Sequence, residues 1–213
     1  MSNLLFLGPP ASGKGTQAKK VASQYGWPHI STGDMFRAAS AQGTALGKEA
    51  HDLYWGKGHL VPDEITNTLA FERLEQDDCK KGYILDGYPR TLGQATALDH
   101  FFLQGRKGLD AVIFFDCSED VLIKRADSRR VCRSCGAIYG AGTTVCQCRG
   151  ELYQRPDDYP KIVRERLGEY LLKTSCLLEF YRKLGLLREI DASKSEHDVF
   201  GDICKLIRQK ANE

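Results

Sequence analysis

The sequence predicts an α/β fold of three layers, in which helices cover both faces of a five-stranded parallel sheet. Five short, mostly apolar runs have the character of buried strands, and amphipathic helical patterns lie between them. A glycine-rich turn that contains a lysine follows the first run, at the edge where such sheets bind phosphates. The five strands are expected at residues 4–7, 29–31, 83–85, 111–116 and 187–191.

Helical periodicity fills most of the sequence between those strands. Parallel neighbours need a crossover connection, so the alternation of strand and helix favours a parallel sheet. Two stretches interrupt it: residues 32–61, helical but with scattered polar and glycine residues, and residues 129–159, which carry a cysteine cluster. Both are expected to project from the edge of the sheet, where segments that handle substrates belong. The expected helices are 15–25, 63–76, 91–104, 119–128, 160–184 and 196–209.

The length and the charge of the chain limit the classes of protein to which it can belong. Its 213 residues suffice for one substantial core. The 30 basic and 28 acidic side chains leave a net charge of +2, which does not indicate a nucleic acid or an anionic membrane as partner. No apolar run approaches membrane-spanning length and the N-terminus lacks the basic start of a signal peptide, so a cytoplasmic protein is expected.

Residues 8–16 read Gly-Pro-Pro-Ala-Ser-Gly-Lys-Gly-Thr and form the first chemical motif. In a glycine-rich turn before a helix, backbone N–H groups and the helix N-terminus face one anion, and Lys14 can reach the outer phosphates. Gly15 stands where Ser or Thr usually follows the lysine, and Thr16 comes one position later. The alternative is a turn whose glycines serve only close packing, but the lysine favours a polyphosphate site.

Polar residues near the second and third predicted strands form the next group. Asp86, at the end of the third strand, is similar to a carboxylate that positions magnesium opposite a phosphate loop. Arg37 and Arg90 offer planar, bidentate donors for a second phosphate group. Gln94 carries the donor and the acceptor that are needed to read a purine edge. Taken singly, these residues also fit a helix cap, surface charges and a solvated helix.

Together the motifs resemble those of the adenylate kinase family, nucleoside monophosphate kinases that interconvert ATP plus AMP with two ADP. The resemblance implies a core of the P-loop NTPase type around the five-stranded sheet, a helical insertion that binds the monophosphate, and a small metal-bearing lid. The implied core comprises residues 1–30, 62–125 and 163–213, the insertion 31–61 and the lid 126–162. The matching motifs are GPPASGKGTQA, ISTGDMFRAA, GHLVPDEI, GYILDGYPRTLGQA, the arginine pair at 129–130, ELYQRPDD and VRERL.

The resemblance implies a donor site for Mg-ATP, with Asp86 holding magnesium through water. Lys194 would contact the adenine through its backbone. Ala11 stands where the family usually has glycine, so a positive φ at this position would strain the loop. The implied ATP-binding residues are Ala11, Ser12, Gly13, Lys14, Gly15, Thr16, Arg125, Arg129, Ile138, Tyr139 and Lys194.

The resemblance also implies an acceptor site for AMP, with Gln94 reading its adenine. The implied AMP-binding residues are Thr32, Arg37, His59, Leu60, Val61, Gly87, Tyr88, Pro89, Arg90, Gln94, Arg155 and Arg166. Phosphoryl transfer needs in-line positioning and charge neutralisation, and no general base is demanded because the AMP phosphate is already ionised. The implied catalytic residues are Lys14, Arg90, Arg129, Arg155 and Arg166. Asp157 and Asp158 are expected to pair with arginines.

Four cysteines between residues 132 and 148 indicate a metal site. Cys132-x-x-Cys135 is a metal knuckle, and Cys146-x-Cys148 is one residue tighter than the usual second half. Four thiolates suit a closed, structural Zn²⁺ site, and such a site also accepts iron. The metal would fold a lid too small for its own hydrophobic core. Four reduced cysteines without metal, or a disulfide pair, are the alternatives.

The resemblance thus implies a monomeric adenylate kinase that maintains adenine nucleotide balance. One alternative is a sister kinase that uses another monophosphate, or GTP as donor. A second is a P-loop NTPase switch, which would leave Arg37, Arg90 and Gln94 without a role. A third is a zinc-ribbon module for interaction or nucleic-acid binding, which the nearly neutral charge disfavours.

Overall fold

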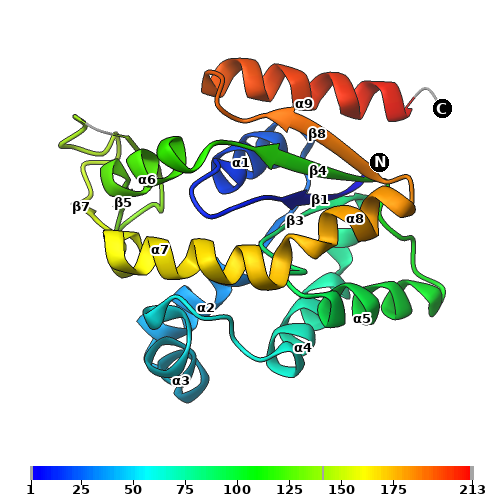
Figure 1. Ribbon diagram of the computed structural model, residues 1–213, viewed down its shortest axis with the longest axis horizontal. Helices are drawn as coiled ribbons and strands as arrows, with labels where there is room; N and C mark the ends of the chain where they lie inside the picture. Colours follow the sequence, from blue (N-terminus) through cyan, green and yellow to red (C-terminus); the bar gives the residue numbers. More distant parts are fainter. Residues whose placement is uncertain (1, 141, 212–213) are drawn as a thin grey trace.

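A five-stranded parallel sheet in the order β2-β3-β1-β4-β8 forms the centre of the computed structural model, which describes residues 2–140 and 142–211 (Figure 1). All five predicted strands are confirmed, with β1 and β3 each one residue longer than predicted. Residues 1, 141, 212 and 213, which the expected segments include, lie outside the described residues. The strands are β1 (Asn3–Leu7), β2 (His29–Ser31), β3 (Tyr83–Asp86), β4 (Ala111–Asp116) and β8 (Leu187–Asp191).

Helices cover both faces of this sheet, as predicted (Figure 1). Side chains alternate along β1, so Leu4 and Phe6 pack into one apolar cluster while Leu5 and Leu7 pack into the other. The first cluster is completed by α1 (Lys14–Tyr25) and α9 (Glu196–Ala211). The second is completed by α4 (Asp63–Leu74), α5 (Leu92–Leu103) and α8 (Cys176–Lys183). The α6 helix (Glu119–Ser128) follows β4.

The continuous helix predicted for residues 160–184 is wrong in its middle. The chain forms α7 (Pro160–Glu169), a π-helical turn η4 (Tyr170–Thr174) and then α8. The wider turn places Thr174 in the interior, where its hydroxyl donates to the carbonyl of Arg90 at 2.7 Å. A tertiary contact therefore replaces the regular helix hydrogen-bond pattern at this point.

Residues 32–61 are helical, as predicted, and lie below the sheet in Figure 1. They form α2 (Thr32–Ala41), α3 (Ala45–Leu53) and the short η1 (Trp55–Lys57), and another short turn, η2 (Asp77–Lys81), precedes β3. The Ser31 hydroxyl accepts from the backbone N–H of Asp34 at 3.3 Å and caps α2. A small apolar cluster centred on Phe36, Ala50 and Val61 holds this segment together, and Ile65 and Leu69 of α4 pack against it.

Residues 129–159 form a small antiparallel sheet that the sequence did not predict. Its strands β5 (Arg130–Cys132), β6 (Ile138–Tyr139) and β7 (Leu152–Tyr153) are ordered β6-β5-β7, and the short turn η3 (Pro156–Asp158) follows. Strands of two or three residues are too short to produce a recognisable alternation. The sheet projects beyond the ends of α6 and α7 (Figure 1). Among the described residues, no helix is long and apolar enough to cross a membrane.

Candidate active site

A cavity lies at the carboxyl edge of the large sheet and is bounded by the turn after β1, by α2, by residues 58–61 and by β6. Every nucleotide-binding residue expected from the sequence lines it, except Tyr88. The Tyr88 side chain is fully buried in the core, and its hydroxyl donates to Oδ1 of Asn67 at 2.7 Å. The side chain therefore does not reach the cavity, although its neighbours Gly87 and Pro89 do.

The glycine-rich turn wraps around the Lys14 ammonium. The Lys14 Nζ donates to the carbonyls of Gly8 and Pro9 at 2.6 and 2.7 Å. Gly8 must be glycine here because an added Cβ would lie 2.9 Å from the carbonyl oxygen of Phe115. Burial lowers the pKa of Lys14 to about 7, an effect that Asp86 opposes and nearby arginines reinforce. The negative charge of a bound phosphate would restore the charged ammonium.

Ala11 has a φ of 64°, in the left-handed region. The sequence left open whether alanine strains this loop, and the backbone shows that it does. The position lies between the β1 strand and α1, on the cavity wall.

The Asp86 carboxylate lies at the end of β3, opposite the glycine-rich turn. A Cβ added at Gly15 would lie only 3.2 Å from its Oδ2, so the carboxylate faces the start of α1. Burial alone raises the pKa of Asp86, but the neighbouring His29, whose Nε2 is 3.1 Å from Oδ2, and the Lys14 charge lower it overall. An ionised carboxylate at this place fits a magnesium ion that accompanies a triphosphate. His29 was not predicted, because only the pairing of β2 with β3 brings it there.

Five arginines also line the cavity. Arg129 makes a bidentate pair with Asp158, with Nε 2.7 Å from Oδ2. Arg166 lies 2.8 Å from Oδ2 of Asp157, so both expected acidic residues do pair with arginines. The five are Arg37, Arg90, Arg129, Arg155 and Arg166.

Arg90 and Arg155 are the least compensated members of this cluster. The Nε of Arg90 donates to the carbonyl of Gly87 at 2.6 Å rather than to a carboxylate. Arg155 lies 3.6 Å from a carboxylate oxygen of Asp34, which Arg37 contacts more closely at 2.6 Å. Burial lowers the pKa of both Arg90 and Arg155 to about 10, and both remain cations at neutral pH. Crowded, buried cations of this kind are stabilised by a polyanion.

Gln94 is held at both ends of its amide. Its Oε1 accepts from the backbone N–H of Arg90 at 2.7 Å, and its Nε2 donates to Oδ1 of Asp63 at 2.8 Å. The hydroxyl of Thr91 donates to the other oxygen of Asp63 at 2.6 Å. Sequence reasoning missed Asp63 and Thr91, since the first reads as an ordinary acidic residue in the first turn of α4 and the second as an N-cap.

The loop after β8 closes the cavity on the side of α1. Arg125 donates to the carbonyl of Ala192 at 2.8 Å and thereby joins α6 to this loop. The Lys194 side chain turns away to Asp202, with Nζ 3.0 Å from Oδ2, while the residue itself lines the cavity. This arrangement fits a contact through the Lys194 backbone. The Tyr139 hydroxyl lies 3.3 Å from the sulfur of Cys146, which couples the cavity wall to the cysteine cluster.

The remaining expected residues lie where α2 and residues 58–61 face α7. Thr32 donates to the carbonyl of Gly87 at 3.1 Å. The Nδ1 of His59 lies 2.9 Å from Oε1 of Glu169, and the other carboxylate oxygen, Oε2, lies 3.0 Å from Nζ of Lys173. Glu169 was not predicted, because nothing in its local sequence distinguishes it from a solvated helix residue. Leu60 and Val61 supply the apolar part of this wall.

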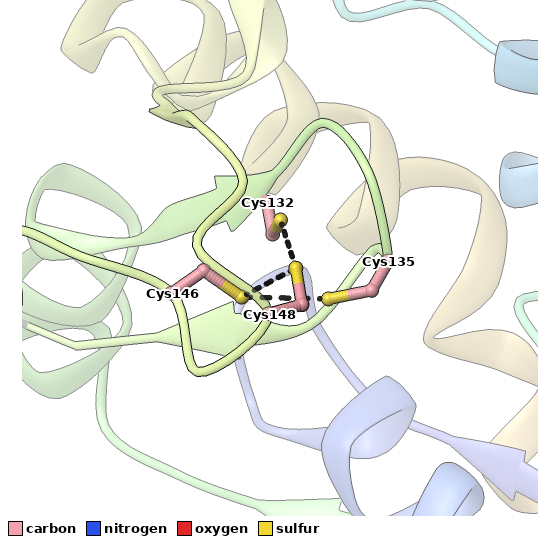
Figure 2. Close-up of side chains that lie close together, drawn as sticks. All are labelled: Cys132, Cys135, Cys146 and Cys148. Atoms are coloured by element: carbon pink, nitrogen blue, oxygen red, sulfur yellow. Dashed lines mark hydrogen bonds between the residues drawn. The ribbon is translucent and has the colours of Figure 1, made fainter.

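The four sulfur atoms of Cys132, Cys135, Cys146 and Cys148 converge (Figure 2). They lie within 4.8 Å of one another. The sulfur of Cys148 is 3.5 Å from that of Cys132 and 3.3 Å from that of Cys146, distances too long for a disulfide bond. All four are therefore free thiols, and the disulfide alternative is wrong. Four sulfur donors grouped in this way fit a tetrahedral metal ion.

The tight Cys-x-Cys spacing is accommodated by the backbone around it. The N–H of Gly136 donates to the carbonyl of Cys132 at 2.9 Å, which forms the first knuckle. The N–H of Arg149 donates to the carbonyl of Cys146 at 2.8 Å, and Arg149 takes a φ of 62°. This turn directs both sulfurs of the second pair into the cluster despite the missing residue.

Known proteins are similar to this chain over nearly its whole length. The family model described as adenylate kinase matches residues 6–186. An adenylate kinase from Fervidobacterium nodosum is 50% identical over 204 residues, covering 92% of this chain and 93% of that protein. One from Archaeoglobus fulgidus is 50% identical over 208 residues, covering 94% and 95%. One from a Geobacillus species is 47% identical over 212 residues, covering 96% and 98%.

Proposed function

Because this chain belongs to the adenylate kinase family, we propose that it transfers the terminal phosphoryl group of Mg-ATP reversibly to AMP, giving two ADP. The observation that carries the proposal is the meeting of two phosphate-binding features in one cavity. Lys14 in the glycine-rich turn and five arginines, of which Arg155 is buried and the others half-buried, line this same cavity. Two polyanionic groups can thus be held together in a single chain, which supports a monomeric enzyme.

In this proposal the ATP phosphates bind to the turn from Ala11 to Thr16, and the loop that contains Lys194 covers the adenine. Arg125 supports that loop from behind, and Ile138 and Tyr139 on β6 close over the donor nucleotide. Asp86, at the end of β3, would hold the magnesium ion beside the donor phosphates. The magnesium ion, when bound, neutralises part of the charge on the donor phosphates.

AMP binds, in this proposal, between α2, residues 58–61 and α5. The guanidinium groups of Arg37 and Arg90 hold its phosphate, and Gln94 meets its adenine. The residues assigned to this site are Thr32, Arg37, His59, Leu60, Val61, Gly87, Pro89, Arg90, Gln94, Arg155 and Arg166. Tyr88 supports it only from the core, through its ring and its backbone.

Lys14 and the arginines Arg90, Arg129, Arg155 and Arg166 stabilise the charge that spreads over the transferring phosphoryl oxygens. Their burial makes this electrostatic contribution larger than it would be in water. The AMP phosphate attacks in its ionised form, so no side chain needs to remove a proton. The chemistry rests on positioning and on charge.

We assign residues 1–30, 62–125 and 163–213 to a core, 31–61 to an AMP-binding insertion and 126–162 to a lid. The insertion has a small apolar cluster that meets the core only at α4, and the lid has its own sheet, which supports movement of each as a unit. Closure of the two over the substrates would exclude water and so prevent wasteful hydrolysis of ATP. Zn²⁺ is the metal we assign to the four cysteines, as a structural ion with no open coordination position.

The test is to incubate the protein with ATP, AMP and magnesium and to measure ADP. Lys14→Met should lower kcat by about 10²–10³ without unfolding the protein, because it removes charge from a preorganised site. Lys20→Met is the matched control, since Lys20 lies on the same helix but makes a surface ion pair with Glu196 at 2.6 Å. It should retain the wild-type rate.

Other substrates distinguish the alternative functions. AMP should be a better acceptor than GMP, CMP and UMP, and ATP a better donor than GTP. Preference for another monophosphate would indicate a sister kinase. ATP hydrolysis without phosphate transfer would indicate an NTPase switch and would overturn the proposal.

A further inference from the structure

The amide of Gln94 has one defined orientation. The backbone N–H of Arg90 can only donate, and it meets Oε1 at 2.7 Å. The carboxylate of Asp63 accepts, and its Oδ1 lies 2.8 Å from Nε2. Gln94 is only 1% exposed, so neither contact can be replaced by bulk water. The donor and the acceptor of this amide are therefore assigned by their partners.

Asp63 is itself held in place from two directions. It belongs to the first turn of α4, while its Oδ2 accepts from the hydroxyl of Thr91 at 2.6 Å. The same hydroxyl accepts from the backbone N–H of Gln94 at 3.0 Å and caps α5. The carboxylate also lies close to Gly93, where an added Cβ would be 2.8 Å from Oδ2. The carboxylate thus joins the starts of two helices directly behind Gln94.

The held amide presents a pattern that distinguishes two purines. Gln94 lines the cavity, and its Oε1 and Nε2 each retain one unused hydrogen-bonding position. Adenine has an amino donor beside the N1 acceptor, which complements an amide oxygen and an amide N–H. Guanine has an oxygen acceptor beside an N1–H donor, so it would require the amide to be reversed. Reversal would place Oε1 against the Asp63 carboxylate and Nε2 against the N–H of Arg90.

We propose that Asp63 is a specificity-determining positioning residue, which makes the acceptor site select adenine over guanine monophosphates. It acts through Gln94 and does not touch the substrate. The inference rests on the proposed function, in which Gln94 meets the acceptor base. It extends that function by naming the group that prevents Gln94 from adapting to guanine.

The test compares kcat and KM for AMP and for GMP, with ATP as donor. Asp63→Ala removes the acceptor and makes room for a water molecule, which serves either amide orientation. We expect KM for AMP to rise and the AMP-to-GMP ratio of kcat/KM to fall about tenfold or more, while KM for ATP stays unchanged. Glu64→Ala is the matched control, because Glu64 is an exposed acidic residue in the same first turn. It should leave the ratio unchanged.

A conservative variant separates positioning from helix stability. Asp63→Asn keeps the size and the capping ability of the side chain, but its amide can either accept from or donate to Gln94, so it should lower the AMP-to-GMP ratio in the same direction as Asp63→Ala. If Asp63→Ala does not fold, Gly93→Ala provides the same test, because its Cβ would displace the carboxylate. An AMP-to-GMP ratio that stays at the wild-type value in the folded variants would overturn the proposal.

Two further measurements show whether a negative result contradicts the proposed function or only the role of Asp63. A wild-type protein that makes no ADP from ATP and AMP would overturn the proposed function and this inference together. A Gln94→Ala variant with an unchanged AMP-to-GMP ratio would remove Gln94 from the acceptor site, and the inference with it. If both of these hold and only the Asp63 variants leave the ratio unchanged, the proposed function stands and Asp63 has no part in specificity.

Discussion

Ala11 occupies a backbone conformation that costs an alanine about 1–2 kcal/mol, because its Cβ crowds the neighbouring carbonyl. The conformation persists because the rest of the turn enforces it. The Lys14 ammonium binds the carbonyls of Gly8 and Pro9, and Ala11 also packs against the cluster around Leu122 in α6. The turn is therefore held in a phosphate-binding shape at a local cost in stability.

Ala11→Gly should stabilise the protein. Glycine adopts a φ of 64° without the Cβ clash, so we expect the free energy of unfolding to rise by about 0.5–1 kcal/mol. The melting temperature, measured by circular dichroism, should rise by about 1–4 °C. Ala38→Gly, on the exposed side of α2, is the control and should lower it, because glycine weakens a helix interior. An Ala11→Gly variant that melts below the wild type would contradict the assignment of strain.

At the scale of elements, the small sheet β6-β5-β7 depends on the cysteine cluster. Its strands have two or three residues each, and of their side chains only those of Val131 and Cys132 are buried. So few apolar groups do not make a stable core. A metal held by the four sulfurs would cross-link the two turns on either side of β6 and would supply the missing stabilisation.

Removal of the metal should loosen residues 129–159 and leave the glycine-rich turn intact. We expect chelation to lower the melting temperature and to expose this segment to limited proteolysis. Cys148→Ser should reproduce the effect, whereas Cys176→Ser, which changes an exposed cysteine outside the cluster, should not. Metal analysis of the purified protein identifies the ion. Unchanged melting after verified metal removal would exclude a structural role for the metal.

At the scale of the whole molecule, carboxylates paired with arginines tie the core to α2 and to the segment around η3. Burial raises the pKa of Asp157, but Arg166 and Arg37 lower it well below its usual value. The pKa of Asp34 is lowered in the same way, chiefly by Arg37 against the effect of burial. A folded-state pKa below the unfolded value stabilises the folded protein above that unfolded value, and the stabilisation is lost as the pH falls through the folded pKa.

The protein should therefore lose stability steeply below about pH 4, the ordinary pKa of an aspartate. Denaturant unfolding at pH 7, 5, 4 and 3 measures this loss. Asp157→Asn should be less stable at pH 7, because Arg166 loses its closest partner, and it should lose less stability than the wild type between pH 4 and pH 3. Asp120→Asn, on the exposed first turn of α6, should follow the wild-type curve. Identical pH profiles for Asp157→Asn and the wild type would refute the linkage.

The parts of the fold that sequence predicted well are those in which each segment carries its own signal. Strands such as β1 and β4 read as apolar runs because both faces of the sheet are covered. The π-helical turn at Tyr170–Thr174 carried no such signal, since it depends on a contact between Thr174 and Arg90 across the core. The strands of the small sheet were too short to recognise.

The same distinction between local and tertiary signals applies to the residues of the candidate site. The glycine-rich turn and the arginines were recognisable from residue type and order. Asp63 and Glu169 were not, because Asp63 contacts Gln94 across 31 residues of sequence and Glu169 contacts His59 across 110. The burial of the Tyr88 side chain also depended on neighbours that its own segment does not contain.

Sequence by itself determined the fold class, the phosphate-binding turn and the inventory of charged groups, because backbone geometry and residue chemistry act over a few neighbouring positions. Tertiary structure alone decided which guanidinium faces which carboxylate, which way the Gln94 amide points and where the long helix widens. These features depend on hydrogen bonds and ion pairs between groups that are far apart in the chain, and only folding brings those groups into contact.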